Sequence, residues 1–280
     1  MRTLTFATAH EGYLPILERS AERHGFALEV LGRGEPWLGM TAKLLAYHAA
    51  IGDLAPEAVV MIVDAYDVFF AGPATETAEL FEKTRMPYLL SSQPYFPHSP
   101  RMRHLVDRVM GLGGSLLSSE LETHELGRPC MGAFMGRAGA LSKLLGALIR
   151  LEDRHRTEND QILVNLHLRD RPGDAHLDHD CRIFQNLWRT RGRLPWHGTF
   201  HPDDRRAELE LLPTGRVENR RTGSLPQVIH GPTNLDMGPL LSRLGYAVDD
   251  LPPRRAHAYY RTSVHGYVKR LIAMGRGRIP

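Results

Sequence analysis

Short apolar segments alternate with segments of helical periodicity, and this alternation constrains the fold more than any other feature. Strand-like segments are Leu4–Ala7, Phe26–Leu31, Ala58–Val63, Tyr88–Ser91 and Gly132–Gly136. Helical spacing occurs at Tyr13–His24, Lys43–Ile51, Thr77–Lys83, Gly139–Asp153 and Asn159–Leu168, the last opening on an asparagine that can cap a helix. Strands separated by helices predict an α/β fold with a mostly parallel central sheet flanked by helices. Sheets of this kind bind ligands at the carboxyl ends of their strands.

The rest of the chain is less regular. A late strand is expected at Gln227–His230 and a terminal helix at Tyr259–Met274. The Gly- and Ser-rich segment Gly111–Pro129 is predicted to be irregular. The segment Arg169–Asn219 is rich in proline and arginine and indicates no clear element. We find no internal repeat and no clear domain boundary in the sequence.

Composition indicates a globular protein without a membrane span. The chain has 280 residues, of which 42% are hydrophobic and 24% charged, enough for one large domain or two small ones. No run of about 18 apolar residues occurs, so no transmembrane helix is expected. The N-terminal MRTLTFATAHEGY has one basic residue and a short apolar run, which argues against a cleaved signal peptide. The two cysteines, Cys130 and Cys181, are too few for a disulfide framework, so a reduced, cytoplasmic setting is expected.

Charge is balanced except near the C-terminus. The formal net charge of +3 is too small to indicate nucleic-acid binding. The segment from Arg254 to Pro280 carries arginine and lysine but no carboxylate. Such a segment is most often a solvated face or a mobile end. The alternative is contact with an anionic partner, such as the inner face of a membrane or an acidic substrate.

Two aspartates interrupt the apolar stretch VVMIVDAYDVFF, which covers Val59–Phe70. Asp64 and Asp67 would point to opposite faces of a straight strand, so they converge only if the chain turns after Asp64. Two carboxylates held together repel each other unless a cation neutralises them. Divalent cations such as Mg²⁺ and Mn²⁺ commonly bind one or two carboxylates together with substrate phosphates. The pair therefore indicates either a metal–diphosphate site or a solvent-facing turn in which Asp64 caps the chain.

The stretch VVMIVDAYDVFFAG resembles the metal motif of the lysyl-hydroxylase-type glycosyltransferases. These are the glycosyltransferase domains of procollagen lysyl hydroxylases and their stand-alone bacterial and viral relatives. Further segments similar to that family follow its order along the chain: FATAHEGYLPILERSAERHGFALEVLGRGEPWLG, GAFMGRA, NDQILVNLHL, LDHDCRIFQNL and VIHGPTN. The resemblance covers roughly residues 3 to 240, and colinear motifs over such a span are far more specific than one motif.

The resemblance implies a GT-A fold, a Rossmann-like nucleotide-sugar-binding domain. We expect this domain at residues 1–245, followed by a basic helical tail at 246–280. Members of the family transfer a hexose from a UDP-sugar, with Mn²⁺ bridging the protein and the diphosphate. By resemblance, Asp64, Asp67 and His230 would be the metal ligands, which suits Mn²⁺ because it accepts imidazole as well as carboxylate. Gly231 would permit a close backbone approach beside His230.

The resemblance also implies a binding site for the donor. Tyr66 would stack on the uracil ring, although aromatic side chains often serve only for packing. Thr8 and Trp37 would complete the uridine pocket. Lys43 would offset the charge of the diphosphate, although it could equally be an exposed helix lysine. Asn234 falls where the family usually has a lysine that contacts phosphate.

Asp160 matches the last residue of the family's acidic run, and Gln161 lies beside it in the sequence. The resemblance makes Asp160 the expected carboxylate at the transferred sugar, as base, nucleophile or acceptor binder. Asp160 could also simply favour the dipole of its helix. The chain departs from the family at Asn159, where a carboxylate is usual, and at Cys130, where the family has asparagine. Asp178 and Asn186, in the similar segment LDHDCRIFQNL, are expected to maintain architecture.

Three functions are compatible with these patterns. The first is a Mn²⁺-dependent hexosyltransferase that uses a UDP-sugar and a hydroxyl acceptor in a glycan, lipid-linked sugar, peptide or small metabolite. Because the chain ends without a hydroxylase domain, collagen is not the expected acceptor. The second, motivated by the departures, is a non-catalytic nucleotide-sugar-binding relative. The third is a metal-dependent phosphohydrolase, which would not need the aromatic side chains Tyr66 and Trp37.

Overall fold

A five-stranded sheet forms the centre of the computed structural model, which describes residues 1–93, 128–155, 159–188, 190–194, 197–232 and 235–252. The strand order is β2-β1-β3-β6-β5. The strands are β1 (Arg2–Phe6), β2 (Leu28–Leu31), β3 (Val59–Val63), β5 (Tyr88–Gln93) and β6 (Arg128–Arg137). β1 is parallel to β2 and β3, whereas β6 is antiparallel to β3 and β5. The predicted mostly parallel sheet is confirmed, and β6 is its reversed strand.

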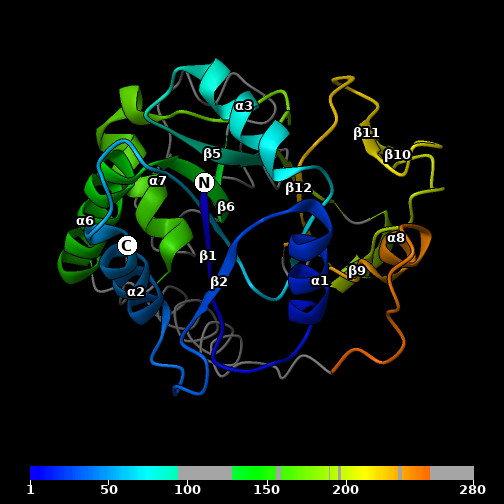
Figure 1. Cartoon of the computed structure of the whole chain (residues 1–280), viewed down its shortest axis with the longest axis horizontal. Helices are drawn as coiled ribbons and strands as arrows, with labels where there is room; N and C mark the ends of the chain where they lie inside the picture. The colour runs from blue at the N-terminus through cyan, green and yellow to red at the C-terminus, as the bar shows by residue number, and fades with distance from the viewer. Residues whose placement is uncertain (94–127, 156–158, 189, 195–196, 233–234, 253–280) are drawn as a thin grey trace, which may run out of the picture.

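Helices cover both faces of this sheet, as predicted (Figure 1). They are α1 (Leu14–His24), α2 (Met40–Gly52), α3 (Ala74–Thr84), α6 (Ala138–His155) and α7 (Asp160–Asp170). α2, α6 and α7 bury Leu44, Leu145 and Leu163 in one core, whereas α1 and α3 bury Leu17 and Phe81 in a second core. The predicted cap of α7 is confirmed, because the side-chain oxygen of Asn159 accepts a hydrogen bond from the Ile162 amide at 3.2 Å.

A smaller sheet packs against the second core. It contains β4 (Val68–Phe70), β12 (Val228–His230) and β7 (Phe184–Asn186), in the order β4-β12-β7. β12 is antiparallel to β4 and parallel to β7. The late strand expected at Gln227–His230 is confirmed as β12. β4 and β7 were not predicted, because strands of three residues are too short to show a two-residue alternation.

The back of the smaller sheet carries a third core. Two hairpins, β8 (Arg191–Leu194) with β9 (His197–Thr199) and β10 (Leu209–Leu211) with β11 (Val217–Asn219), lie in the region without a sequence assignment, which also contains the short 3-10 helix η1 (Pro172–Asp174). Together with α8 (Gly238–Arg243), β10 and β11 surround the buried side chains of Phe69 and Ile229. Tyr246 is 6% exposed and packs in this core against Phe69. Packing against the domain therefore continues beyond position 245.

One irregular segment was predicted wrongly in part. Arg128 and Pro129, the end of the segment predicted to be irregular, begin β6 and pair with Gln93 and Ser92 of β5. Pairing with β5 outweighs the local Gly- and Ser-rich composition, which favoured a loop. The rest of that segment, the expected helix at 259–274 and the basic tail after residue 252 lie outside the described residues.

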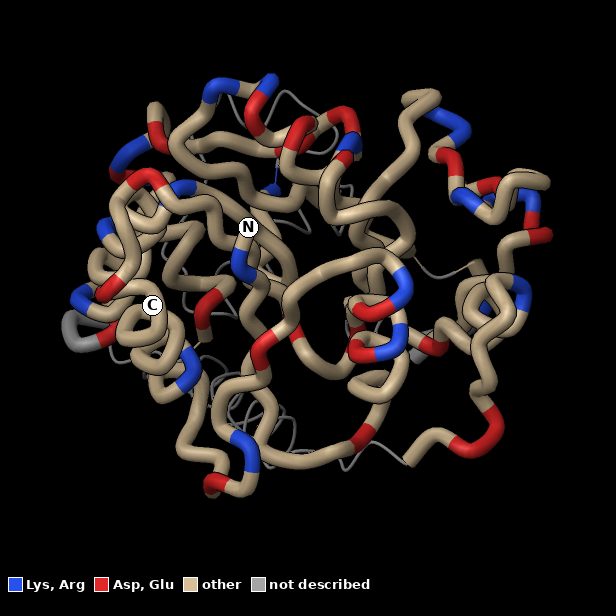
Figure 2. Tube along the Cα trace, in the orientation of Figure 1, with Lys and Arg blue, Asp and Glu red and all other residues tan. Residues whose placement is uncertain are grey.

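The described part of the chain has no membrane-spanning helix, and its charged residues are of both signs (Figure 2). No helix there combines the length and apolarity needed to cross a bilayer. Figure 2 shows basic and acidic residues interspersed along the described trace.

Asp178 organises the turn that leads into β7, as the expected architectural role requires. Its Oδ2 accepts hydrogen bonds from the amides of Ile183 and Phe184, both at 2.8 Å, and its Oδ1 accepts one from Arg182 at 3.1 Å. The carboxyl is buried, and burial raises its pKa although the three amides oppose this. The turn fixes where β7 begins and therefore which residues face the neighbouring strand β12.

Replacing Asp178 by alanine is expected to lower the free energy of unfolding by about 3 kcal/mol or more, because three amides lose their acceptor. Asp178→Asn keeps one oxygen and is expected to cost less than the alanine variant. Chemical denaturation of the three proteins measures both differences. An alanine variant as stable as the parent would contradict the assigned role.

Candidate metal centre and adjoining carboxylate

The connection Asp64–Asp67 carries the chain from the large sheet to the small one. β3 ends at Val63 and β4 begins at Val68, and the residues between them bend. The Asp64 amide donates to the carbonyl of Gly132 in β6 at 2.8 Å, and the Asp67 carbonyl accepts from the Gly231 amide at 2.8 Å. The turn that the aspartate spacing required is present, and both of its ends are fixed by backbone hydrogen bonds.

The turn brings the two aspartates to His230. One oxygen of Asp64, one oxygen of Asp67 and one ring nitrogen of His230 lie within 4.8 Å of one another. His230 ends β12 and pairs with Val68, the residue after Asp67, so the antiparallel pairing of β4 with β12 creates this proximity. Asp67 and His230 are buried, whereas the Asp64 side chain is 32% exposed. Two carboxylates and an imidazole form a donor set that fits Mn²⁺, and the exposed side gives access to a phosphate.

A glycine makes room for the histidine ring. A Cβ atom on Gly132 would lie 2.1 Å from His230 Cε1, so only glycine fits there. Gly132 lies within the GAFMGRA segment, and its role was not predicted from the sequence. The expected close approach at Gly231 is also present, but its partner is Met237, whose Sδ would lie 2.5 Å from a Cβ. The absence of a side chain at Gly231 therefore allows Met237 to pack beside the site.

Two side chains contact Nδ1 of His230, the ring nitrogen that faces away from Asp67. Its Nδ1 lies 2.7 Å from Asn186 Oδ1 and 3.5 Å from Cys130 Sγ, whereas its Nε2 lies 3.6 Å from Asp67 Oδ1. Burial lowers the pKa of His230, but the Cys130 and Asp67 side chains raise it more, and the pKa lies well above its ordinary value. Asn186 was expected to maintain architecture only, and its contact with the histidine was not predicted.

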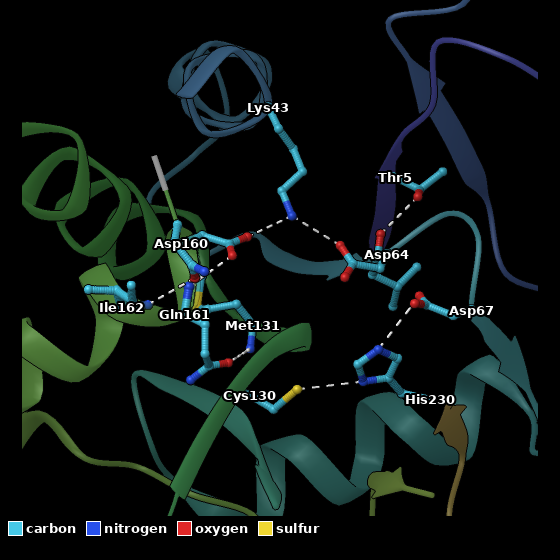
Figure 3. Close-up of polar contacts among 12 residues, drawn as sticks. Thr5, Lys43, Asp64, Asp67, Cys130, Met131, Asp160, Gln161, Ile162 and His230 are labelled. Atoms are coloured by element: carbon cyan, nitrogen blue, oxygen red, sulfur yellow. Dashed lines mark hydrogen bonds and ion pairs between the residues drawn. The ribbon is translucent and has the colours of Figure 1, made fainter. Parts of the chain in front are cut away.

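Lys43 joins the metal-ligand candidates to Asp160 (Figure 3). Its Nζ lies 2.7 Å from Asp160 Oδ2 and 3.1 Å from Asp64 Oδ1, and the lysine is buried. Burial lowers the pKa of Lys43, but the two carboxylates raise it well above its ordinary value, so the ammonium stays charged. Burial raises the pKa of Asp64, an effect that Lys43 opposes and the nearby carboxylates reinforce. Lys43 is thus not an exposed helix lysine, because it bridges two carboxylates.

Asp160 and Gln161 begin α7 but point to different partners. Asp160 is 6% exposed and faces Lys43, and its Oδ1 accepts a hydrogen bond from the Gln161 amide at 2.8 Å. The side-chain amide of Gln161 contacts the backbone of β6, accepting from Met131 at 3.2 Å and donating to the Pro129 carbonyl at 2.6 Å. This geometry assigns Gln161 to holding α7 against β6. The catalytic role expected for Gln161 stays a prediction.

The residues expected around the uridine follow three strands of the large sheet: Thr8 follows β1, Trp37 follows β2 and Tyr66 follows β3. Tyr66 is 8% exposed, and its hydroxyl is bonded to the Ala9 carbonyl at 3.1 Å and to the Ala9 amide at 3.2 Å. Thr8 precedes Ala9 and is half-buried, and Trp37 packs edge-on against Phe6. Asn234 lies outside the described residues. The structure thus fixes Tyr66 beside the loop that follows β1.

Comparison with known proteins identifies the family. The chain is 29% identical over 252 residues to the multifunctional procollagen lysine hydroxylase and glycosyltransferase LH3 of Homo sapiens, an alignment that covers 84% of this chain and 30% of that protein. It is 28% identical over 255 residues to procollagen-lysine,2-oxoglutarate 5-dioxygenase 1 of Mus musculus, with the same coverage of 84% and 30%. The chain thus spans about 30% of the length of these curated relatives.

The family described as PLOD GT domain matches residues 1–249, which include the central sheet, the smaller sheet and the Asp64–Asp67–His230 group. The expected family and its GT-A-type α/β fold are thereby confirmed. The chain belongs to the PLOD GT domain family and is a glycosyltransferase domain of that type.

Proposed function

We propose that the chain transfers a hexose from a UDP-sugar to a hydroxyl acceptor and that it depends on Mn²⁺. The observation that carries this proposal is the convergence of Asp64, Asp67 and His230 within 4.8 Å beside the buried Lys43–Asp160 pair. Family membership supports a sugar transfer rather than phosphate-ester hydrolysis. The human relative LH3 is itself named as a glycosyltransferase.

Asp64, Asp67 and His230 would hold the metal ion. When bound, Mn²⁺ supplies Lewis-acid stabilisation of the negative charge that develops on the departing diphosphate. Asp67 and His230 are buried and fixed by the paired strands, so they need little rearrangement to coordinate an ion. The more exposed Asp64 faces the side from which a diphosphate can approach.

Lys43 and Asp160 would act next to the transferred sugar. The ammonium of Lys43 lies 2.7 Å from the buried Asp160, and a carboxylate in this position can accept a proton from an acceptor hydroxyl or stabilise positive charge on the sugar. Lys43 lies between Asp64 and Asp160, so its charge also acts on a diphosphate held at the metal. These roles need no contribution from Gln161 beyond positioning.

Thr8, Trp37 and Tyr66 would bind the uridine, and Asn234 would lie near the diphosphate. The acceptor would be a hydroxyl group of a glycan, lipid-linked sugar, peptide or small metabolite. The same proposal places the protein in the cytoplasm, with its basic tail in contact with the inner face of a membrane. Loss of liposome association on deleting residues 254–280 would support the membrane contact, and unchanged association would contradict it.

A non-catalytic nucleotide-sugar-binding protein is the second candidate. Asn159 favours it, because the family usually has a carboxylate there and this asparagine instead caps α7 with its side chain. Both candidates bind a UDP-sugar, but only the transferase releases UDP in the presence of an acceptor. A screen of UDP-sugars against glycan, peptide and lipid-linked acceptors separates them by UDP release.

Replacing Asp67 or His230 by alanine is expected to abolish Mn²⁺-dependent binding of UDP, because each change removes a metal ligand. Isothermal titration of UDP with and without Mn²⁺ measures this effect. Asp53→Ala is a matched control, since Asp53 is an exposed aspartate at the end of α2. UDP binding that is equal with and without Mn²⁺ in the parent protein would refute the metal site.

Replacing Lys43 by methionine is expected to strengthen binding of Mn²⁺ alone by about tenfold or more, while sugar transfer falls. Removing a positive charge 3.1 Å from Asp64 relieves its repulsion of the ion, and Asp160 loses its partner. The metal-free variant is expected to be about 3–5 kcal/mol less stable, because a buried ion pair is broken.

Calorimetric titration of Mn²⁺ and thermal unfolding with and without the ion test the effect of Lys43. The control is Lys143→Met, which removes an exposed lysine from α6. Weaker binding of Mn²⁺ alone by the Lys43 variant would show that this lysine supports the metal site instead of competing with it.

A further inference from the structure

His230 and Asn186 meet across a pair of parallel strands. β12 and β7 pair so that His230 lies opposite Asn186, and the Leu187 amide extends this ladder by donating to the His230 carbonyl at 2.7 Å. Both side chains are buried, with exposed fractions of 4% and 5%. Their contact of 2.7 Å between His230 Nδ1 and Asn186 Oδ1 is therefore set by strand register and closed off from solvent.

The orientation of the Asn186 amide is determined by a third group. Asn186 Nδ2 donates to the carbonyl of Ser92 in β5 at 2.8 Å. A carbonyl oxygen can only accept, so the amide nitrogen has to face Ser92 and the amide oxygen has to face the histidine. The opposite rotamer would place two acceptors against each other at Ser92.

An oxygen facing Nδ1 selects one form of the imidazole. Because the amide oxygen only accepts, Nδ1 of a neutral His230 has to carry the hydrogen, which leaves the lone pair on Nε2. Nε2 is the nitrogen that faces Asp67, at 3.6 Å from its Oδ1. The lone pair thus points into the Asp64–Asp67–His230 group, where a metal ion would accept it.

We propose that Asn186 is a positioning residue that fixes His230 in the Nδ1–H tautomer and so prepares Nε2 to bind the metal ion. Partners of this kind commonly change metal affinity by 10- to 100-fold, since they orient the ligand and raise its basicity. The proposal rests on His230 being a metal ligand, as in the proposed function. Cys130 Sγ, at 3.5 Å from the same nitrogen, is a longer contact of lesser weight.

The tautomer is measured directly in the unmodified protein. Long-range ¹H–¹⁵N NMR of the metal-free chain, at a pH high enough to keep the ring neutral, distinguishes the two forms, and a His230→Gln variant identifies the signal. We expect the hydrogen on Nδ1. A hydrogen on Nε2 would overturn the proposal without any variant having to fold.

Variants of Asn186 test the consequence for metal binding. Asn186→Leu keeps a similar volume but has no acceptor, and Mn²⁺ affinity in calorimetry without donor is expected to fall 10- to 100-fold. Asn186→Asp keeps an oxygen at Nδ1 but places a second acceptor against the Ser92 carbonyl, so it is expected to be less stable than the parent. Its Mn²⁺ affinity is expected to stay within about threefold of the parent or to rise. Affinity equal to that of the parent in Asn186→Leu would overturn the proposal.

A neighbouring residue provides the matched control. Gln185 is a buried amide of the same strand, but its side chain bonds to Asn219 and to the Asn186 carbonyl instead of the histidine. Gln185→Leu is expected to lose stability while keeping Mn²⁺ affinity, and an equal loss of affinity would assign the effect to the strand and overturn the proposal.

The His230→Ala variant tests the metal site separately from the role of Asn186. If it binds Mn²⁺ as the parent does, the metal site of the proposed function fails. If it loses binding while Asn186→Leu does not, only the role of Asn186 fails.

Discussion

The antiparallel pairing of β4 with β12 is the constraint on which the rest of the site depends. Two aspartates separated by two residues diverge on a continuous strand. Here the chain leaves the large sheet at Val63 and enters the small one at Val68, and both carboxylates lie in the bend between the sheets. Because His230 pairs with Val68, the third ligand candidate arrives from a position far along the sequence. The site is thus a property of the junction between two sheets.

Electrostatics explains why this junction tolerates so many carboxylates. Asp67 and Asp160 are buried, and the partly exposed Asp64 lies between them. Buried carboxylates are costly unless cations or donors compensate them. Lys43 compensates Asp64 and Asp160, and His230 compensates Asp67. A divalent ion would supply the positive charge that this arrangement still lacks, so the site is suited to gain stability from a bound metal–diphosphate.

The sequence predicted the large sheet, its helices and the convergence of Asp64, Asp67 and His230, because those elements show clear periodicity or belong to family motifs. It did not predict β4 and β7, because three residues carry no alternation and their pairing depends on distant strands. The roles of Gly132 and Asn186 were missed for the same reason. A glycine beneath a histidine ring and an amide beside its Nδ1 become visible only when strands from different parts of the chain are paired.

The reversed direction of β6 explains how one strand contacts both Asp64 and the start of α7, which carries Asp160. β6 has ten residues and β3 has five, and the pairing of Val63 with Ala133 leaves the first residues of β6 beyond the carboxyl end of β3. A strand parallel to β3 would end at the same edge of the sheet as β3, whereas the antiparallel β6 begins beyond that edge. In this overhanging part, the Gly132 carbonyl accepts a hydrogen bond from the Asp64 amide. The backbone of Pro129 and Met131 forms hydrogen bonds with the side chain of Gln161, the neighbour of Asp160. The spacing between the metal-ligand candidates and the adjoining carboxylate therefore also depends on the backbone of β6, which its pairing with β3 keeps in register.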